Sequence, residues 1–108
     1  MTTENALPVA VRDIPESKNY EAIVNGSVVG TLIYELEGRR VVLTHTIVEP
    51  AYREHGVATT LVRGALDDIR AKGLKITVFC SFVSEFLAEN PAYADLVDAD
   101  HPGHAFTR

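Results

Sequence analysis

The sequence of 108 residues predicts a single α+β domain, and two observations carry that prediction. The first half alternates β-branched and polar residues in short runs separated by turn residues, which is typical of antiparallel strands. The second half changes to an apolar period of about 3.6 residues, which is typical of an amphipathic helix. A chain of this length buries one modest core. We therefore expect a core over about residues 9–97 and a loose tail over residues 98–108.

The strands of the first half are expected over residues 9–14, 20–24, 28–36 and 40–48. Asn25-Gly26 predicts a tight hairpin between the second and third runs, because both residues tolerate positive φ. Gly38 marks the next turn in the same way. Strands joined by such short turns form an antiparallel meander.

After Pro50 the apolar residues recur at helical spacing, namely at Val57, Ala58, Leu61, Val62, Ala65, Leu66 and Ile69. Lys72-Gly73 closes this helix as a last-turn cation followed by a C-cap glycine. Residues 75–80 predict a fifth strand, and a crossover of this length makes it parallel to the fourth. Residues 82–89 predict a second helix, and Asn90-Pro91 predicts the start of a third that runs to Val97.

Composition excludes several functional classes. The formal net charge is −5 and the basic residues are dispersed, so we expect no nucleic-acid partner. No apolar run approaches the ~20 residues of a membrane span, and the N-terminus carries no secretion signal, so a cytoplasmic location is expected. The one cysteine and the scattered histidines match no zinc spacing, so we expect no metal. The oligomeric state stays open between a monomer and a weak dimer.

The stretch EPAYREHGVATTLV joins the fourth strand to the long helix. Gly56 permits positive φ, and the first amides of the helix that follows lack helical partners and carry the positive end of its dipole. Together with Arg53, Thr59 and Thr60 as added donors, these features predict an anion site. A glycine that serves packing alone would give the same spacing. The G-K-[ST] and G-x-G-x-x-G nucleotide fingerprints are absent.

Arg53-Glu54-His55-Gly56-Val57-Ala58 resembles the [Gln/Arg]-x-x-Gly-x-[Gly/Ala] motif of the GNAT N-acetyltransferase superfamily. The order HTIVEPAYREHGVATTLV, GLKITVFCSFV, NPAYADLV is similar to the small, minimal members of that superfamily. The resemblance implies the acyl-CoA N-acyltransferase fold, with acetyl-CoA as co-substrate. It places the CoA pyrophosphate on the backbone from Arg53 to Thr59, and it implies that a backbone N–H near Ile47 or Val48 polarises the thioester carbonyl.

One departure from the family concerns the acceptor side. Full-length members have two helices between the first and second strands, which wall the acceptor site. Here only residues 15–19 lie between those strands, so the helices are absent. We therefore expect an open acceptor side, and the sequence does not identify the acceptor.

The transfer reaction requires a neutral amine. An amine with a pKa of ~10.4 is neutral only about once in 10³ molecules at pH 7, a deficit of roughly 4–5 kcal/mol that a base offsets in part. His45 is the first candidate base; its neighbours at spacing two are Leu43 and Ile47, so a core histidine is the alternative. Glu49 is a second candidate, acting through water, or else an exposed carboxylate.

The resemblance also suggests roles for residues late in the chain. Cys80 lies beside the expected thiol position, either as a nucleophile that forms an acetyl-cysteine or as a packing residue. Tyr93 resembles the tyrosine that protonates the leaving thiolate, and a core position is the alternative. Asn90 is a helix cap or a pantetheine contact.

The sequence therefore predicts an acetyl-CoA-dependent N-acetyltransferase. Its acceptor is expected to be an amine on a small molecule, a protein lysine or an N-terminus, which attacks directly in a ternary complex. A CoA-binding or regulatory module with little catalysis is one alternative. A structural domain whose glycine turn is only a turn is another.

Overall fold

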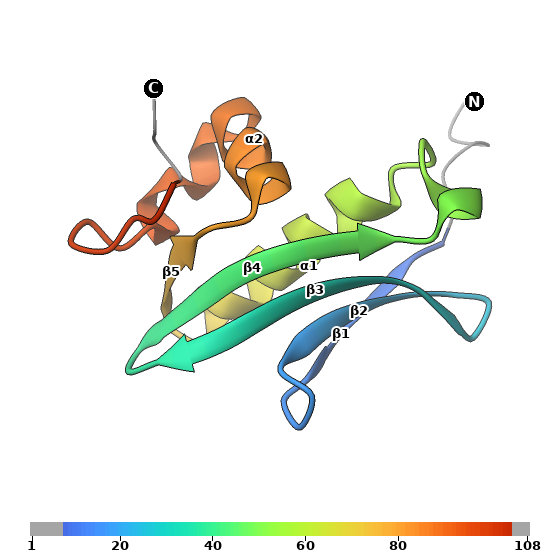
Figure 1. The fold of residues 1–108 in the computed structure, drawn as a ribbon, viewed down its shortest axis with the longest axis horizontal. Helices are drawn as coiled ribbons and strands as arrows, with labels where there is room; N and C mark the ends of the chain where they lie inside the picture. Colours follow the sequence, from blue (N-terminus) through green and yellow to red (C-terminus); the bar gives the residue numbers. More distant parts are fainter. Residues whose placement is uncertain (1–7, 105–108) are drawn as a thin grey trace.

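Five strands form one sheet in sequence order (Figure 1). The structure, a computed structural model, describes residues 8–104. Its strands are β1 (Ala10–Ile14), β2 (Asn19–Val24), β3 (Ser27–Glu37), β4 (Arg40–Val48) and β5 (Lys75–Val78). Neighbouring strands from β1 to β4 are antiparallel, and β5 is parallel to β4. The predicted meander and parallel addition are confirmed.

The helices are α1 (Val57–Ala71) and α2 (Ser81–Glu89), with 3-10 turns at Pro50–Tyr52 and Pro91–Leu96. Helix α1 lies across one face of the sheet (Figure 1). The buried side of α1 comprises Val57, Leu61, Val62, Ala65, Leu66 and Ile69, which are the residues of the predicted apolar period. The third expected helix is a 3-10 helix.

A β-bulge interrupts the pairing of β3 with β4. Leu43 pairs with Tyr34 and His45 pairs with Ile33, so Thr44 is the extra residue on β4. Leu43 is buried in the core, whereas His45 is exposed. The sequence-based expectation that Leu43 and His45 share a face is therefore wrong, because the bulge breaks the alternation between them.

The connection from β1 to β2 is short. Residues 15–18 close it as a tight turn, in which the amide of Ser17 donates to the carbonyl of Ile14 at 3.1 Å. Within the described residues 15–18, no helix lies between β1 and β2, so the short connection predicted from the sequence is confirmed.

Residues 98–104 run along the outer edge of β5 and form the segment called here the C-terminal strap. The amide of Val78 donates to the carbonyl of Pro102 at 3.1 Å, and the amide of His104 donates to the carbonyl of Val78. The Thr77 hydroxyl donates to the carbonyl of His101 at 2.6 Å. The expectation of a loose tail from residue 98 is corrected for this segment, because the strap pairs with the outer edge of β5 through the backbone of Ile76 and Val78. Residues 105–108 lie outside the described range.

A polar network fixes the C-terminal half of α1 to the sheet. The Tyr20 hydroxyl donates to Asp68 at 2.7 Å, and the Tyr34 hydroxyl donates to Asp13 at 2.7 Å. Lys72 joins both carboxylates, at 2.9 Å to Asp13 and 2.7 Å to Asp68. Burial, reinforced by the bond to Asp68, raises the pKa of Tyr20 well above its ordinary value. This network holds the position of α1 at the end remote from Gly56.

Candidate functional site

The loop between β4 and α1 contains the first part of the site. Gly56 caps α1 with φ 77°, in the left-handed region that favours glycine. A Cβ built at Gly56 would meet nothing within 4 Å. The glycine therefore serves the backbone conformation rather than packing against described neighbours, and the space in front of it is open.

The first amides of α1 face that open space. The first helical hydrogen bond runs from the amide of Thr60 to the carbonyl of Gly56, at 3.0 Å. Within the described residues the amides of Val57, Ala58 and Thr59 donate to no protein acceptor. Together with the positive end of the dipole of a 15-residue helix, these amides make the region electrostatically favourable for an anion. A cavity of about 300 Å³ lies here, the Gly56 cavity, lined by Val48, Tyr52, Arg53, Glu54, Gly56, Val57, Ala58, Thr59 and Phe82.

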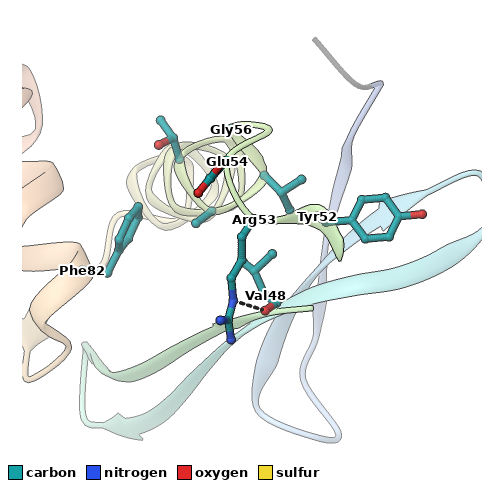
Figure 2. A pocket seen from close by; sticks show the side chains of 9 residues that line it. Val48, Tyr52, Arg53, Glu54, Gly56 and Phe82 are labelled. Atoms are coloured by element: carbon teal, nitrogen blue, oxygen red, sulfur yellow. Dashed lines mark hydrogen bonds between the residues drawn. The ribbon is translucent and has the colours of Figure 1, made fainter. Parts of the chain in front are cut away.

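The charged side chains of the loop have a mixed effect on anion binding. Arg53 donates from Nε to the carbonyl of Val48 at 3.2 Å, and Figure 2 shows its guanidinium directed away from Gly56. Glu54 lines the same cavity with its negative charge and has φ 70°. His55 is exposed and does not line the cavity. The backbone amides are therefore the main hydrogen-bond donors that this cavity offers to an anion.

A second cavity opens where β4 and β5 diverge. The last bond between these strands runs from the amide of Phe79 to the carbonyl of Leu43, at 2.9 Å. This divergence ends β5 at Val78, earlier than the expected residue 80. The Cys80 cavity beyond it has a volume of about 270 Å³ and is lined by Thr44, His45, Thr46, Phe79, Cys80, Ser81 and Phe82.

The Cys80 cavity brings together two of the predicted catalytic residues. Cys80 is buried, with its Sγ 3.1 Å from the Thr46 hydroxyl, and the exposed His45 lines the same cavity. The alternative of a core histidine is wrong for His45. Phe82 lines both this cavity and the Gly56 cavity, so the two cavities adjoin beside β4, and the pair is called here the groove along β4.

The backbone direction of β4 distinguishes Ile47 from Val48. The amide of Glu49 donates to the carbonyl of Val29 in β3, at 2.9 Å. Because successive peptide edges alternate along a strand, the amide of Val48 points away from β3 and toward the groove. The bond from Arg53 to the Val48 carbonyl agrees with this direction. The side chain of Val48 is buried, whereas that of the neighbouring Ile47 is 55% exposed and lies on the other face of the sheet from Val48.

Several sequence-predicted residues line neither cavity, among them Ile47, Glu49, His55, Asn90 and Tyr93. The Tyr93 hydroxyl donates to Asp67 of α1 at 2.7 Å, and this bond raises the pKa of Tyr93. Asn90 donates from Nδ2 to the carbonyl of Phe86 at 2.8 Å and accepts from Arg63 at 3.4 Å. The structure therefore does not bring Tyr93 or Asn90 to the groove. Asn90 precedes Pro91 as expected, but its side chain caps the preceding helix.

Sequence reasoning missed Phe82, Thr46 and Tyr52 as lining residues. Phe82 is the second residue of α2 and lies two residues after Cys80, and its place in the sequence next to Cys80 was the one available indication.

Within residues 8–104, no group of His, Cys, Asp and Glu side chains is suited to hold a metal ion. Over the same range, no helix combines the length and apolarity needed to cross a membrane.

The comparisons with known proteins agree on one family. A protein-family model described as GCN5-related N-acetyl-transferase matches residues 19–96. Protein NATD1 of Bos taurus is 34% identical over 90 residues, which cover 82% of this chain and 80% of the relative. Protein NATD1 of Homo sapiens is 33% identical over 90 residues, with coverage of 82% and 80%.

Solved structures add support for the fold. An NMR structure of a GCN5-like protein from Staphylococcus aureus has a TM-score of 0.58 at 17% identity, covering 85% of this chain and 93% of the other. The ribosomal-protein-S18-alanine N-acetyltransferase from Escherichia coli has a TM-score of 0.52 at 20% identity, covering 56% and 39%. At these identities the likeness concerns the fold alone.

Proposed function

Because this chain belongs to the GCN5-related N-acetyltransferase family, we propose that it binds acetyl-CoA and transfers the acetyl group to an amine. One observation carries the proposal: the unpartnered amides of Val57, Ala58 and Thr59 face an open cavity that adjoins a second cavity along β4, within the described residues. A continuous groove of this kind suits an extended donor with a charged end and a reactive end.

The pyrophosphate of acetyl-CoA binds the amides at the start of α1, where the helix dipole favours negative charge. The Thr59 hydroxyl is a further donor at the rim of the Gly56 cavity. The pantetheine arm passes Phe82 and brings the thioester beside Thr46 and Cys80. The amide of Val48, which points toward the groove, donates to the thioester oxygen as charge develops on it.

Transfer proceeds by direct attack. The neutral amine attacks the thioester carbonyl, a C–N bond forms and the C–S bond breaks. The proton lost by the nitrogen goes to His45, or to Glu49 through water, and the leaving thiolate takes up a proton. Cys80 lines the thiol end of the groove without forming a covalent intermediate. Tyr93 stays outside the proposed catalytic set because its hydroxyl is bonded to Asp67.

Thermal unfolding with and without CoA tests the donor site. CoA at about 100 times its dissociation constant should stabilise the protein by about 2.7 kcal/mol. No shift at millimolar CoA would contradict the proposal. Mass spectrometry of amine and peptide pools incubated with acetyl-CoA then tests turnover. CoA binding without any acetylated product would identify a CoA-binding module instead.

A further inference from the structure

A third cavity, of about 440 Å³, lies beside the start of β3 and the end of β4. It shares Val48 and Arg53 with the Gly56 cavity, so the two cavities adjoin at the end of β4. We call it the Glu49 cavity; its lining is Val28, Val29, Gly30, Thr31, Ile47, Val48, Glu49, Pro50 and Arg53.

The lining of this cavity includes one carboxylate and one guanidinium. Glu49 and Arg53 stand at the two ends of the 3-10 turn Pro50–Tyr52, which the bond from the amide of Tyr52 to the carbonyl of Glu49 closes at 2.8 Å. Neither side chain forms an ion pair with the other or with any other described residue. A carboxylate and a guanidinium held apart in one cavity are complementary to a ligand that carries both charges.

The guanidinium of Arg53 keeps its bidentate edge available. Only its Nε donates, to the carbonyl of Val48 at 3.2 Å, and that bond fixes the group at the edge of β4. Figure 2 shows the terminal nitrogens beyond Val48, on the side away from Gly56. A planar pair of N–H donors in this position matches the two oxygens of a carboxylate.

The remaining wall of the cavity is apolar. Val28 is 42% exposed and Ile47 is 55% exposed, and both line the cavity. Covering such side chains with a small apolar group removes their surface from water and is favourable. The Thr31 side chain supplies the one hydroxyl of the lining.

We propose that the Glu49 cavity binds the acceptor, and that the acceptor is a free α-amino acid with a small apolar side chain. This inference rests on the proposed acetyltransferase function. The carboxylate of the ligand binds Arg53, its ammonium group binds Glu49, and its side chain packs on Val28 and Ile47. Val48 lines the Glu49 cavity, and we place the ligand nitrogen next to the end of β4 where the Val48 amide meets the thioester oxygen.

The protons of the transfer balance as follows. The ammonium group gives one proton to Glu49, which releases it to solvent, and the neutral amine attacks the thioester carbonyl. As the C–N bond forms and the C–S bond breaks, the nitrogen loses a second proton, which His45 passes to the leaving thiolate. The products are the N-acetyl amino acid, CoA and one proton.

A ligand series on the CoA-bound protein tests the charge requirement without any mutation. L-valine, isobutylamine, valinamide and isovalerate share an apolar group, but only valine carries both charges. Titration by calorimetry should show that valine binds at least about tenfold more tightly than the other three, a difference of about 1.4 kcal/mol. If valinamide or isobutylamine binds as tightly as valine, the ligand carboxylate contributes nothing to binding and the proposal is overturned. Valinamide also mimics a peptide N-terminus, so tight binding of valinamide would indicate a peptide acceptor.

A variant pair assigns the binding to this cavity. Glu49→Gln should weaken valine binding at least about tenfold and leave isovalerate unchanged, because it removes the partner of the ammonium alone. Glu35→Gln is the matched control: Glu35 is an exposed carboxylate of the same sheet and lines none of the three cavities described. Equal valine affinity in Glu49→Gln and wild type would overturn the assignment. A normal CoA stabilisation with no valine binding contradicts this inference alone, whereas loss of CoA stabilisation in wild type contradicts the proposed function.

Discussion

The two ends of the groove along β4 are built by different means. At the Gly56 end the binding groups are backbone amides, presented by one glycine cap and the first turn of α1. At the Cys80 end they are side chains from β4, the end of β5 and the start of α2, brought together by the sheet register. A backbone site is encoded within a few residues, whereas a side-chain site depends on pairing between distant segments. Variants at the two ends should therefore fail in different ways.

The largest effect is expected at the glycine cap. Gly56→Val should abolish the stabilisation by CoA, because a β-branched residue is strained at φ 77° and its side chain would occupy the open space before the amides. Thermal unfolding with and without CoA measures this. Gly38→Val is the control: Gly38 has φ 62° and equally open surroundings in the turn between β3 and β4. It should lose comparable stability and keep CoA binding. Normal CoA binding by Gly56→Val would contradict the assignment of the Gly56 cavity as the pyrophosphate site.

His45 should separate binding from turnover at the opposite end. His45→Ala should lower kcat by about 100-fold, the range of a lost general base, while the CoA-induced stabilisation stays at the wild-type value. The exposed position of His45 makes a large loss of stability unexpected. Steady-state kinetics and thermal unfolding on the same samples check both parts. An unchanged kcat would transfer the role of base to Glu49.

Cys80 should show a smaller kinetic effect. In direct transfer, Cys80→Ala removes only a contact with Thr46 and part of the cavity wall, so kcat should fall by about tenfold or less. A covalent route would instead require the thiol, and the variant would lose nearly all turnover. Mass spectrometry of the wild-type protein with acetyl-CoA and no acceptor is the decisive measurement: an acetyl adduct on Cys80 would establish the covalent route.

The C-terminal strap supports only the Cys80 end. A Cβ at Gly103 would collide with the carbonyl of Val78, so Gly103→Ala should detach the strap and release the Phe79 ring from the His104 ring, now 5.1 Å away. We expect a loss of about 2 kcal/mol of stability and faster hydrogen exchange at Val78, with CoA binding retained.

Gly73→Ala is the control for the strap, because Gly73 has φ 71° but its Cβ would meet only Arg39 at an ordinary 3.6 Å. Gly73→Ala should lower the free energy of unfolding by about 1 kcal/mol through backbone strain. It should leave hydrogen exchange at Val78 unchanged. Loss of CoA binding in Gly103→Ala would show that the two ends are coupled.

The same contrast explains how much the sequence revealed. The apolar period predicted α1 and the Gly56 motif predicted a left-handed glycine cap with unpartnered amides, because both signals are local. The bulge at Thr44 arises from pairing with β3, which the β4 sequence does not encode by itself, so the face of His45 was misjudged. The strap was missed because edge hydrogen bonds need no apolar period. Tyr93 was placed by family position, whereas its contact with Asp67 depends on how the Pro91–Leu96 turn returns to α1.

The smallest effect is expected at Glu54. Its backbone conformation is unfavourable for a non-glycine residue, and its negative charge opposes the binding of an anion in the Gly56 cavity. Its φ of 70° costs a non-glycine residue about 1 kcal/mol, and its carboxylate lines the cavity meant for an anion. Glu54→Gly should raise stability by about 0.5 kcal/mol, after the entropy of the unfolded chain is subtracted, and should tighten CoA binding a few-fold.

Two companions resolve these contributions at Glu54. Lys18→Gly relieves a similar backbone, with φ 56°, in the turn between β1 and β2, and should add stability without changing CoA affinity. Glu54→Gln removes the charge and keeps the strain, so it should tighten CoA binding without adding stability. Calorimetric titration of CoA against all three variants measures the affinities. If the neutral variants bind CoA no better than wild type, the carboxylate does not face the phosphate, and the anion lies nearer Thr59 than Glu54.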